Sequence, residues 1–211
     1  MQKLIVFSVF FLMVVHSNAS TDPKALKILT NVDKKYTQYK SLKIEFDLET
    51  KVAESKPKNE KGSFVYQGDA FKMILPQQEI YFNGSVQWTY LVSQKEVQIS
   101  KIESAENPFH PKYLVKLYKS DQYEYQLIST TKSEAVFDFK PLDRKESVFK
   151  IKLYINTTTN QITKVQWFEK NGSNSIIKVK SNTVNAKIPN SDFEMKTDQL
   201  KGIHIEDLRE E

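Results

Sequence analysis

The chain has 211 residues, 39% of them hydrophobic, with a net charge of +5 and no cysteine. This length is enough for one domain with a sizeable core. The mild positive charge is spread along the chain, which argues against a nucleic-acid-binding protein and favours a solvated surface, with attraction to anionic membranes as the weaker alternative. The lack of cysteine excludes disulfides, and it excludes a lipid anchor on a cysteine of this chain itself.

The first residues predict an export signal. Met1-Gln2-Lys3 is a short positive start, Leu4 to Val15 is almost wholly apolar, and Ser17-Asn18-Ala19 places small residues where a signal peptidase cleaves. We expect cleavage after Ala19 rather than a membrane-spanning helix, because such a helix needs roughly 20 apolar residues. The mature chain would be one domain over 20–211. Export without cysteine points to the periplasm of a Gram-negative bacterium.

Asp22-Pro23 predicts the start of a helix, since an N-cap residue is followed by proline at the first helical position. Apolar residues then recur at helical spacing as far as Tyr39, which predicts an amphipathic helix over 23–39. After this helix the period changes to two. From Leu42 to Leu48 apolar residues alternate with charged ones, as in a strand with one solvated face.

Two strands follow a charged loop over 54–61, and then segment 79–99 predicts three strands joined by two tight turns. Asn83-Gly84 suits the first turn because both residues tolerate positive φ. Each strand of the meander gathers apolar residues on one face; these are Ile80 and Phe82, then Val86, Trp88, Tyr90 and Val92, then Val97 and Ile99. We expect this aromatic face to be the covered face of the sheet.

A proline-containing break over 104–112 leads into a short apolar helix, 112–118, and strands resume at Tyr123. The total is ten or eleven antiparallel strands, one long helix and one short helix, without a linker or a repeat. This pattern predicts an α+β fold that is mainly antiparallel β. We expect a single curled sheet forming an open, half-closed β-barrel, with the helices as a lid over its concave mouth.

No catalytic or metal-binding pattern stands out, so we expect a protein that is not an enzyme and needs no cofactor or metal. The mature chain has two histidines, His110 and His204, far apart and without a carboxylate cluster around them. We interpret His110, between two prolines, as structural or exposed, and His204 as a strand residue. No serine elbow occurs, and the five glycines form no phosphate-binding loop.

Aromatic residues are the positive signal. The chain holds 13 Phe, 10 Tyr and 2 Trp, many of them at alternate strand positions. For any single residue the simplest interpretation is a hydrophobic core. For the whole set, one sheet under two helices offers limited cover, which favours a cavity for an apolar ligand.

Several segments resemble the outer-membrane lipoprotein carrier (LolA) family, and the resemblance spans nearly all of the mature chain. Asn83-Gly84-Ser85-Val86-Gln87-Trp88-Thr89-Tyr90 is similar to the family's Gly, Trp, x, Tyr pattern, and Lys61-Gly62-Ser63-Phe64 to its glycine-led strand. Segment 96–99 looks like the version in Bacteroidetes-type members. Asn107-Pro108 through Leu117 is similar to the family's Pro-containing stretch ahead of a short apolar helix. Phe193 is similar to its closing Phe, and Gly202 through Arg209 to its Gly-Val-x-Val-x-Asp ending.

The resemblance implies a periplasmic chaperone for lipoprotein transport, whose hydrophobic cavity shields acyl chains between the inner and the outer membrane. The implied partners are acylated lipoproteins and an inner-membrane ABC transporter complex, with an outer-membrane receptor left open; we expect a monomer. One departure concerns a basic Arg-Pro pair of proteobacterial members, in whose place this chain has Gln67-Gly68-Asp69. The role of that arginine is therefore not carried over.

Alternation assigns the side chains expected to line the acyl-chain cavity, so an error of one residue in register would move a whole strand to the other face. They are Leu26, Leu29, Phe64, Tyr66, Phe71, Met73, Leu75, Ile80, Phe82, Trp88, Tyr90 and Leu117. Two rivals stay open. One is a related open barrel that binds another lipid or senses envelope stress; the other is a secreted enzyme with an unrecognised site.

Overall fold

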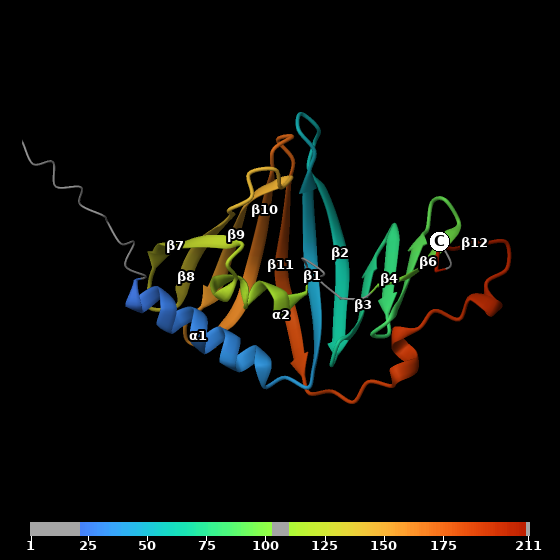
Figure 1. Ribbon diagram of the computed structural model, residues 1–211, viewed down its shortest axis with the longest axis horizontal. Coiled ribbons are helices and arrows are strands. Elements are labelled where there is room, and N and C mark those ends of the chain that lie inside the picture. The colour runs from blue at the N-terminus through green and yellow to red at the C-terminus, as the bar shows by residue number, and fades with distance from the viewer. Residues whose placement is uncertain (1–21, 103–109, 210–211) are drawn as a thin grey trace, which may run out of the picture.

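The computed structural model describes residues 22–102 and 110–209, which form one twelve-stranded curled sheet with two α-helices over its concave side (Figure 1). The predicted signal peptide with its cleavage site after Ala19 lies outside the described residues, as does Asn107-Pro108. In the part that the structure describes, no helix is long and apolar enough to cross a membrane.

The strands follow one another in the sheet as β12-β6-β5-β4-β3-β2-β1-β11-β10-β9-β8-β7. Their bounds are β1 Ser41–Lys51, β2 Lys58–Gln67, β3 Ala70–Leu75, β4 Gln78–Phe82, β5 Val86–Leu91, β6 Glu96–Lys101, β7 Tyr123–Thr130, β8 Glu134–Pro141, β9 Val148–Asn156, β10 Gln161–Glu169, β11 Asn174–Val184 and β12 His204–Asp207. The pairing of β1 with β11 joins the two halves of the chain at the middle of the sheet. Because β12 and β7, at its two ends, do not pair with each other, the sheet stays open, which confirms the predicted fold class.

The C-terminal strand differs from the prediction. His204 is a strand residue, as expected, but β12 runs parallel to β6, whereas every other neighbouring pair is antiparallel. Segment 185–203 makes this pairing possible, because it passes from the end of β11 to the far edge of the sheet, where β12 lies beside β6 (Figure 1).

The long helix α1 (Pro23–Thr37) begins as predicted, since Asp22 accepts a hydrogen bond from the Lys24 amide at 2.9 Å and Pro23 occupies the first turn. The predicted short helix is two separate turns, α2 (Pro111–Leu114) and the 3₁₀ turn η1 (Leu117–Lys119). Both helices pack apolar side chains on the concave face of the sheet, and Figure 1 shows them lying across it.

Gly62 shows why a glycine leads strand β2. A Cβ atom at this position would lie 2.5 Å from the ring of Phe46 and 2.7 Å from the side chain of Leu75. Such distances are far below van der Waals contact. Glycine therefore lets the Phe46 ring lie directly on the backbone of the neighbouring strand, at the centre of the concave face.

The apolar side chains change faces between β4 and β5. Phe82 pairs with Gln87 and Tyr81 pairs with Trp88, and directly paired residues share a face. Phe82 is buried in the main core, so Trp88 lies on the opposite, convex face, together with Tyr90. The expectation that Trp88 and Tyr90 face the concave cavity is therefore wrong.

The hairpin register explains this correction. The backbone hydrogen bond from Asn83 N to Val86 O closes a turn centred on Gly84-Ser85, one residue later than predicted, with Gly84 at φ +108°. In a two-residue hairpin, the numbers of two residues that pair directly add up to an odd number, so an even-numbered residue of one strand shares a face with an odd-numbered residue of the other. Alternation within each strand does not by itself show which residues of the two strands share a face.

A second, smaller apolar layer lies on the convex side. Val97, Ile99 and Phe193 are each no more than 5% exposed, yet none belongs to the main core. The C-terminal segment is held here by hydrogen bonds from Gln67 to Asn190 and from Asn83 to Glu194. This cover explains how β5 and β6 can turn apolar residues away from the cavity.

Candidate functional site

An apolar cavity lies between the middle of the sheet and the two helices. It is lined by Tyr36, Tyr39, Leu42, Ile44, Phe46, Phe64, Met73, Pro111, Leu114, Gln161, Ile162, Val165, Trp167, Ile177, Val179 and Asn182. The enclosed and open space between these side chains measures about 620 Å³, but the part in which a water molecule can sit is only about 40 Å³. One water molecule needs about 10–15 Å³ of such space. The cavity is therefore a narrow slot with room for only a few water molecules.

The predicted cavity residues lie in four different places. Phe64 and Met73 line the cavity, and seven more belong to the main core or pack on it around the slot: Leu29, Tyr66, Phe71, Phe82, Leu117 and the partly buried pair Leu75 and Ile80. Leu26 is 42% exposed, because it lies outside the stripe of α1 that carries Ala25, Leu29 and Tyr36, so its placement in the cavity is wrong. Trp88 and Tyr90 lie on the convex face, as described above.

Sequence reasoning missed the whole second half of the lining. Val165, Trp167, Ile177 and Val179 come from β10 and β11, which the β1–β11 pairing brings beside the N-terminal strands. Their alternation in the sequence is as clear as that of β2 and β3. The missing information was the long-range pairing, which no local pattern contains.

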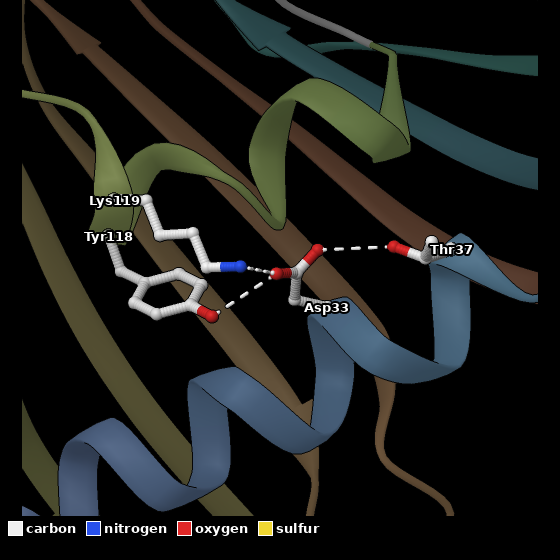
Figure 2. Close-up of polar contacts among 4 residues, drawn as sticks. All are labelled: Asp33, Thr37, Tyr118 and Lys119. Atoms are coloured by element: carbon white, nitrogen blue, oxygen red, sulfur yellow. Dashed lines mark hydrogen bonds and ion pairs between the residues drawn. The ribbon is translucent and has the colours of Figure 1, made fainter.

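A buried aspartate ties the two parts of the lid together. Asp33 of α1 accepts hydrogen bonds from the Tyr118 hydroxyl at 3.1 Å and from Thr37 Oγ1 at 3.4 Å, and it forms an ion pair with Lys119. Figure 2 shows both η1 side chains reaching toward α1 from the opposite segment. Because this contact joins lid to lid, it holds the two halves closed over the sheet; we call it the Asp33 latch.

His110 is structural, one of the two possibilities expected for it. It is 5% exposed, stacks on Tyr66 at 4.7 Å between ring centroids, and meets Phe64 edge-on at 5.4 Å. Its Nδ1 accepts a hydrogen bond from the Lys112 amide at 3.1 Å and so caps α2. Burial, and secondarily the charges of Lys112 and Lys116, lower the pKa of His110 to about 4, so the imidazole is neutral at physiological pH.

Tyrosines and amides form one polar end of the cavity. The Tyr36 hydroxyl accepts a hydrogen bond from the Ile162 amide at 3.1 Å, and the Tyr39 hydroxyl accepts one from Gln161 at 3.4 Å. Burial raises the pKa of both phenols, so they stay protonated. This end of the slot is therefore polar but uncharged, while the remainder is apolar.

The convex face has a different chemistry. Lysines and carboxylates pair across its strands, with Lys152 2.6 Å from Asp138, Lys178 3.1 Å from Glu49 and Lys180 3.0 Å from Asp47. Within residues 22–102 and 110–209, no three His, Cys, Asp or Glu side chains gather as a metal site would require. The concave cavity is thus the strongest candidate for a binding site.

A family model described as "Outer membrane lipoprotein carrier protein LolA" matches residues 37–196. This match covers most of the chain. The chain belongs to the LolA family. The matched range includes the whole sheet except β12, and it includes both turns of the smaller lid segment.

The solved structures that this chain is similar to are very distant from it in sequence. A conserved protein from Thermus thermophilus has a TM-score of 0.57 at 11% identity, covering 87% of this chain and 99% of that one. The LolA superfamily protein NE2245 from Nitrosomonas europaea has a TM-score of 0.45 at 13% identity, covering 82% and 98%. The Pseudomonas aeruginosa MucA/MucB complex has 0.39 at 12% identity, covering 82% and 60%. Among curated proteins, none matches this chain. The first of these likenesses shows that this chain and the Thermus thermophilus protein share a fold.

Proposed function

We propose that this protein is a periplasmic carrier that shields the acyl chains of lipoproteins in its concave cavity and takes them from the inner to the outer membrane. The observation that carries the proposal is the apolar slot on the concave face. Its walls come from strands of both halves of the sheet, and the helices α1 and α2 cover it. Membership of the LolA family supports the same function.

The energetics suit such a carrier. Each CH₂ group exposed to water costs about 0.8 kcal/mol, so an acyl chain of roughly 16 carbons needs on the order of 10 kcal/mol of shielding to cross an aqueous space. The concave face offers a continuous apolar surface for this purpose, with the adaptable side chain of Met73 in its lining. A binding role of this kind needs no catalytic residue, and we propose no enzymatic activity.

The slot is too narrow for an acyl chain as it stands, so loading requires α1 and α2 to move away from the sheet. Few polar contacts oppose this movement. From α1, Lys35 Nζ donates to the Thr159 carbonyl at 2.6 Å and the Tyr36 hydroxyl accepts from Ile162 N; from α2, Lys112 Nζ donates to the Gly68 carbonyl at 3.0 Å. Most of the lid rests on apolar side chains, which an acyl chain can replace. The closed slot is therefore the unloaded form of the carrier.

The proposed cargo is acylated lipoprotein, received from an inner-membrane ABC transporter complex and passed to the outer membrane directly or through a receptor. In this proposal the carrier is exported by means of a signal peptide, which is then cleaved, and it acts as a monomer. An envelope-sensing protein with the same fold is the alternative that the sequence leaves open, and it would not need to carry acylated cargo.

Native mass spectrometry of protein exported to the periplasm tests the proposal. Wild-type protein should carry acylated peptide, and Met73→Trp should lose it because the larger side chain fills the slot. Ile74→Trp is the matched control, since this neighbour of Met73 on β3 lies on the convex face and the change should leave the cargo in place. Cargo-free wild-type protein, or equal loss in both variants, would contradict the proposal.

A further inference from the structure

A buried hydroxyl group without a protein partner lies beside the polar end of the cavity. Tyr66 is fully buried on β2, and its Oη has no hydrogen-bond partner among the described residues. Leaving such a group unpaired costs about 1–3 kcal/mol, so a native protein rarely keeps one without a reason. Tyr66 pairs with Leu42 across the β1–β2 register, and Leu42 lines the cavity, so both belong to the same wall.

Two further phenols line the polar end of the cavity. The rings of Tyr36 and Tyr39 lie 5.3 Å apart at the end of α1, and both line the cavity. Each accepts one hydrogen bond, from Ile162 N and from Gln161, and within the described residues neither hydroxyl donates one. Burial first, and then the charges of Tyr36 and Tyr39, raise the pKa of Tyr66, which agrees with its place beside Leu42 on the wall of the cavity.

The site therefore holds three phenol O–H groups, none of which donates a hydrogen bond within the described residues. Gln161 donates to Asn182 Oδ1 at 3.3 Å as well, so the amides of this end are already engaged with one another and with Tyr39. A group that satisfies these phenols must bring acceptor oxygens. Burial disfavours a negative charge here, as it does on the phenols themselves. The Lys112 ammonium lies over the Tyr66 ring, 4.8 Å from its centroid, but it donates away from the cavity to the Gly68 carbonyl at 3.0 Å. An uncharged carbonyl fits better than a carboxylate or a phosphate.

We propose that the hydroxyls of Tyr66, Tyr36 and Tyr39 form a carbonyl-binding subsite, which takes the ester oxygens at the head of an acyl chain whose tail lies in the apolar slot. The subsite rests on the proposed carrier function, and it would let the carrier select its ligands by their polar head as well as by their apolar chain. The apolar walls bind any long chain, whereas the phenols favour a chain that ends in an ester. Two sources of such esters are a diacylglyceryl-modified cysteine and a membrane phospholipid.

Tyr66→Phe is the variant that isolates this role. It removes a hydroxyl that makes no hydrogen bond within the described protein, whereas changing Tyr36 would also free the Ile162 amide. Without ligand, Tyr66→Phe should be as stable as the wild type or more stable, because an unpaired buried hydroxyl is removed. Tyr154→Phe is the matched control, since Tyr154 lies on the convex face beneath Lys164.

The binding test uses a synthetic lipopeptide with two ester-linked palmitoyl chains, and its analogue with ether-linked hexadecyl chains. Tyr66→Phe should weaken binding of the ester probe about fivefold to tenfold, the effect of one hydrogen bond, and should leave the ether probe unchanged. A dipalmitoyl phospholipid, run in parallel, distinguishes the two ester sources by its affinity for the wild type.

The outcomes separate the two proposals. If the wild type binds both probes but Tyr66→Phe weakens both equally or neither, the subsite is wrong and the carrier stands. If Tyr66→Phe lowers the melting temperature clearly, the hydroxyl has a structural partner and the subsite is also wrong. If the wild type binds no acylated probe at all, both proposals fail.

Discussion

Strands β1 to β3 and strand β5 follow the same alternating pattern but turn their aromatic residues to opposite sides of one sheet. Phe46, Phe64 and Phe71 face the lid and the cavity, whereas Trp88 and Tyr90 face away from it. The first region is covered by α1 and α2, whereas the C-terminal segment contacts the second side of the sheet, with Glu194 bonded to Asn83 and β12 paired with β6. The comparison shows that an aromatic face marks a covered surface, and that the cover decides whether the surface can also bind.

The largest expected effect compares one aromatic residue from each region. Phe71→Ala should lower the free energy of unfolding by about 3–5 kcal/mol, because the ring is buried between Phe64 and Phe82 at centroid distances of 5.7 and 5.3 Å. Trp88→Ala should cost about 1–2 kcal/mol, since its ring is only partly buried on the convex face. Urea unfolding measures both. Equal costs would contradict the placement of these residues on different faces.

A smaller effect, on the pH dependence of stability, is expected to differ between the two histidines His110 and His204. His110 is buried in the cavity region and has a pKa of about 4, whereas the unfolded chain has about 6.5. The unfolded state therefore binds its proton at a higher pH than the folded state. Stability should fall as the pH drops from about 6.5 to about 4, by about 3 kcal/mol, and this contribution should level off below that range.

His110→Asn checks the pH effect while keeping an acceptor for the α2 cap. The variant should lose the fall in stability between pH 6.5 and 4, measured by urea unfolding at a series of pH values. His204→Gln is the matched control, because His204 is exposed on β12 at the edge of the other region. An unchanged pH profile in His110→Asn would show that other groups cause the fall.

The smallest effect concerns the Asp33 latch. Asp33→Asn keeps the shape of the side chain but removes the ion pair with Lys119, and should cost about 1–2 kcal/mol of stability. Because the latch joins the two lid segments, the variant should also take up an acyl probe faster. Stopped-flow fluorescence measures the rate. Asp47→Asn, which breaks the convex pair with Lys180, is the control and should leave uptake unchanged.

Much of the fold could be predicted from the sequence because its signals are local. The cap at Asp22-Pro23 and the alternation of strands β1 to β6 depend only on neighbouring residues. The parallel pairing of β12 and the lining contributed by Trp167 and Ile177 depend on contacts between distant segments, which alternation does not contain. The exposure of Leu26 is not predictable in the same way, because a few apolar residues at helical spacing leave the edge of the buried stripe of α1 undefined.

The placement of Trp88 was a different kind of error. The two-residue hairpin was expected, and its odd-sum register places even residues of β4 against odd residues of β5. The face of Trp88 could therefore have been derived by combining the turn with the alternation. The same combination applies to any meander whose turns are short enough to define their register.

The two tryptophans of the chain provide the most direct test of the acyl-chain cavity, since Trp167 lines the cavity and Trp88 lies on the convex face. Trp88→Phe leaves only Trp167, and Trp167→Phe leaves only Trp88. A lipopeptide with bromine atoms along its acyl chains should quench the fluorescence of Trp167 strongly and that of Trp88 very little. Quenching of Trp88 alone, or of neither tryptophan, would contradict the binding of acyl chains in the concave cavity.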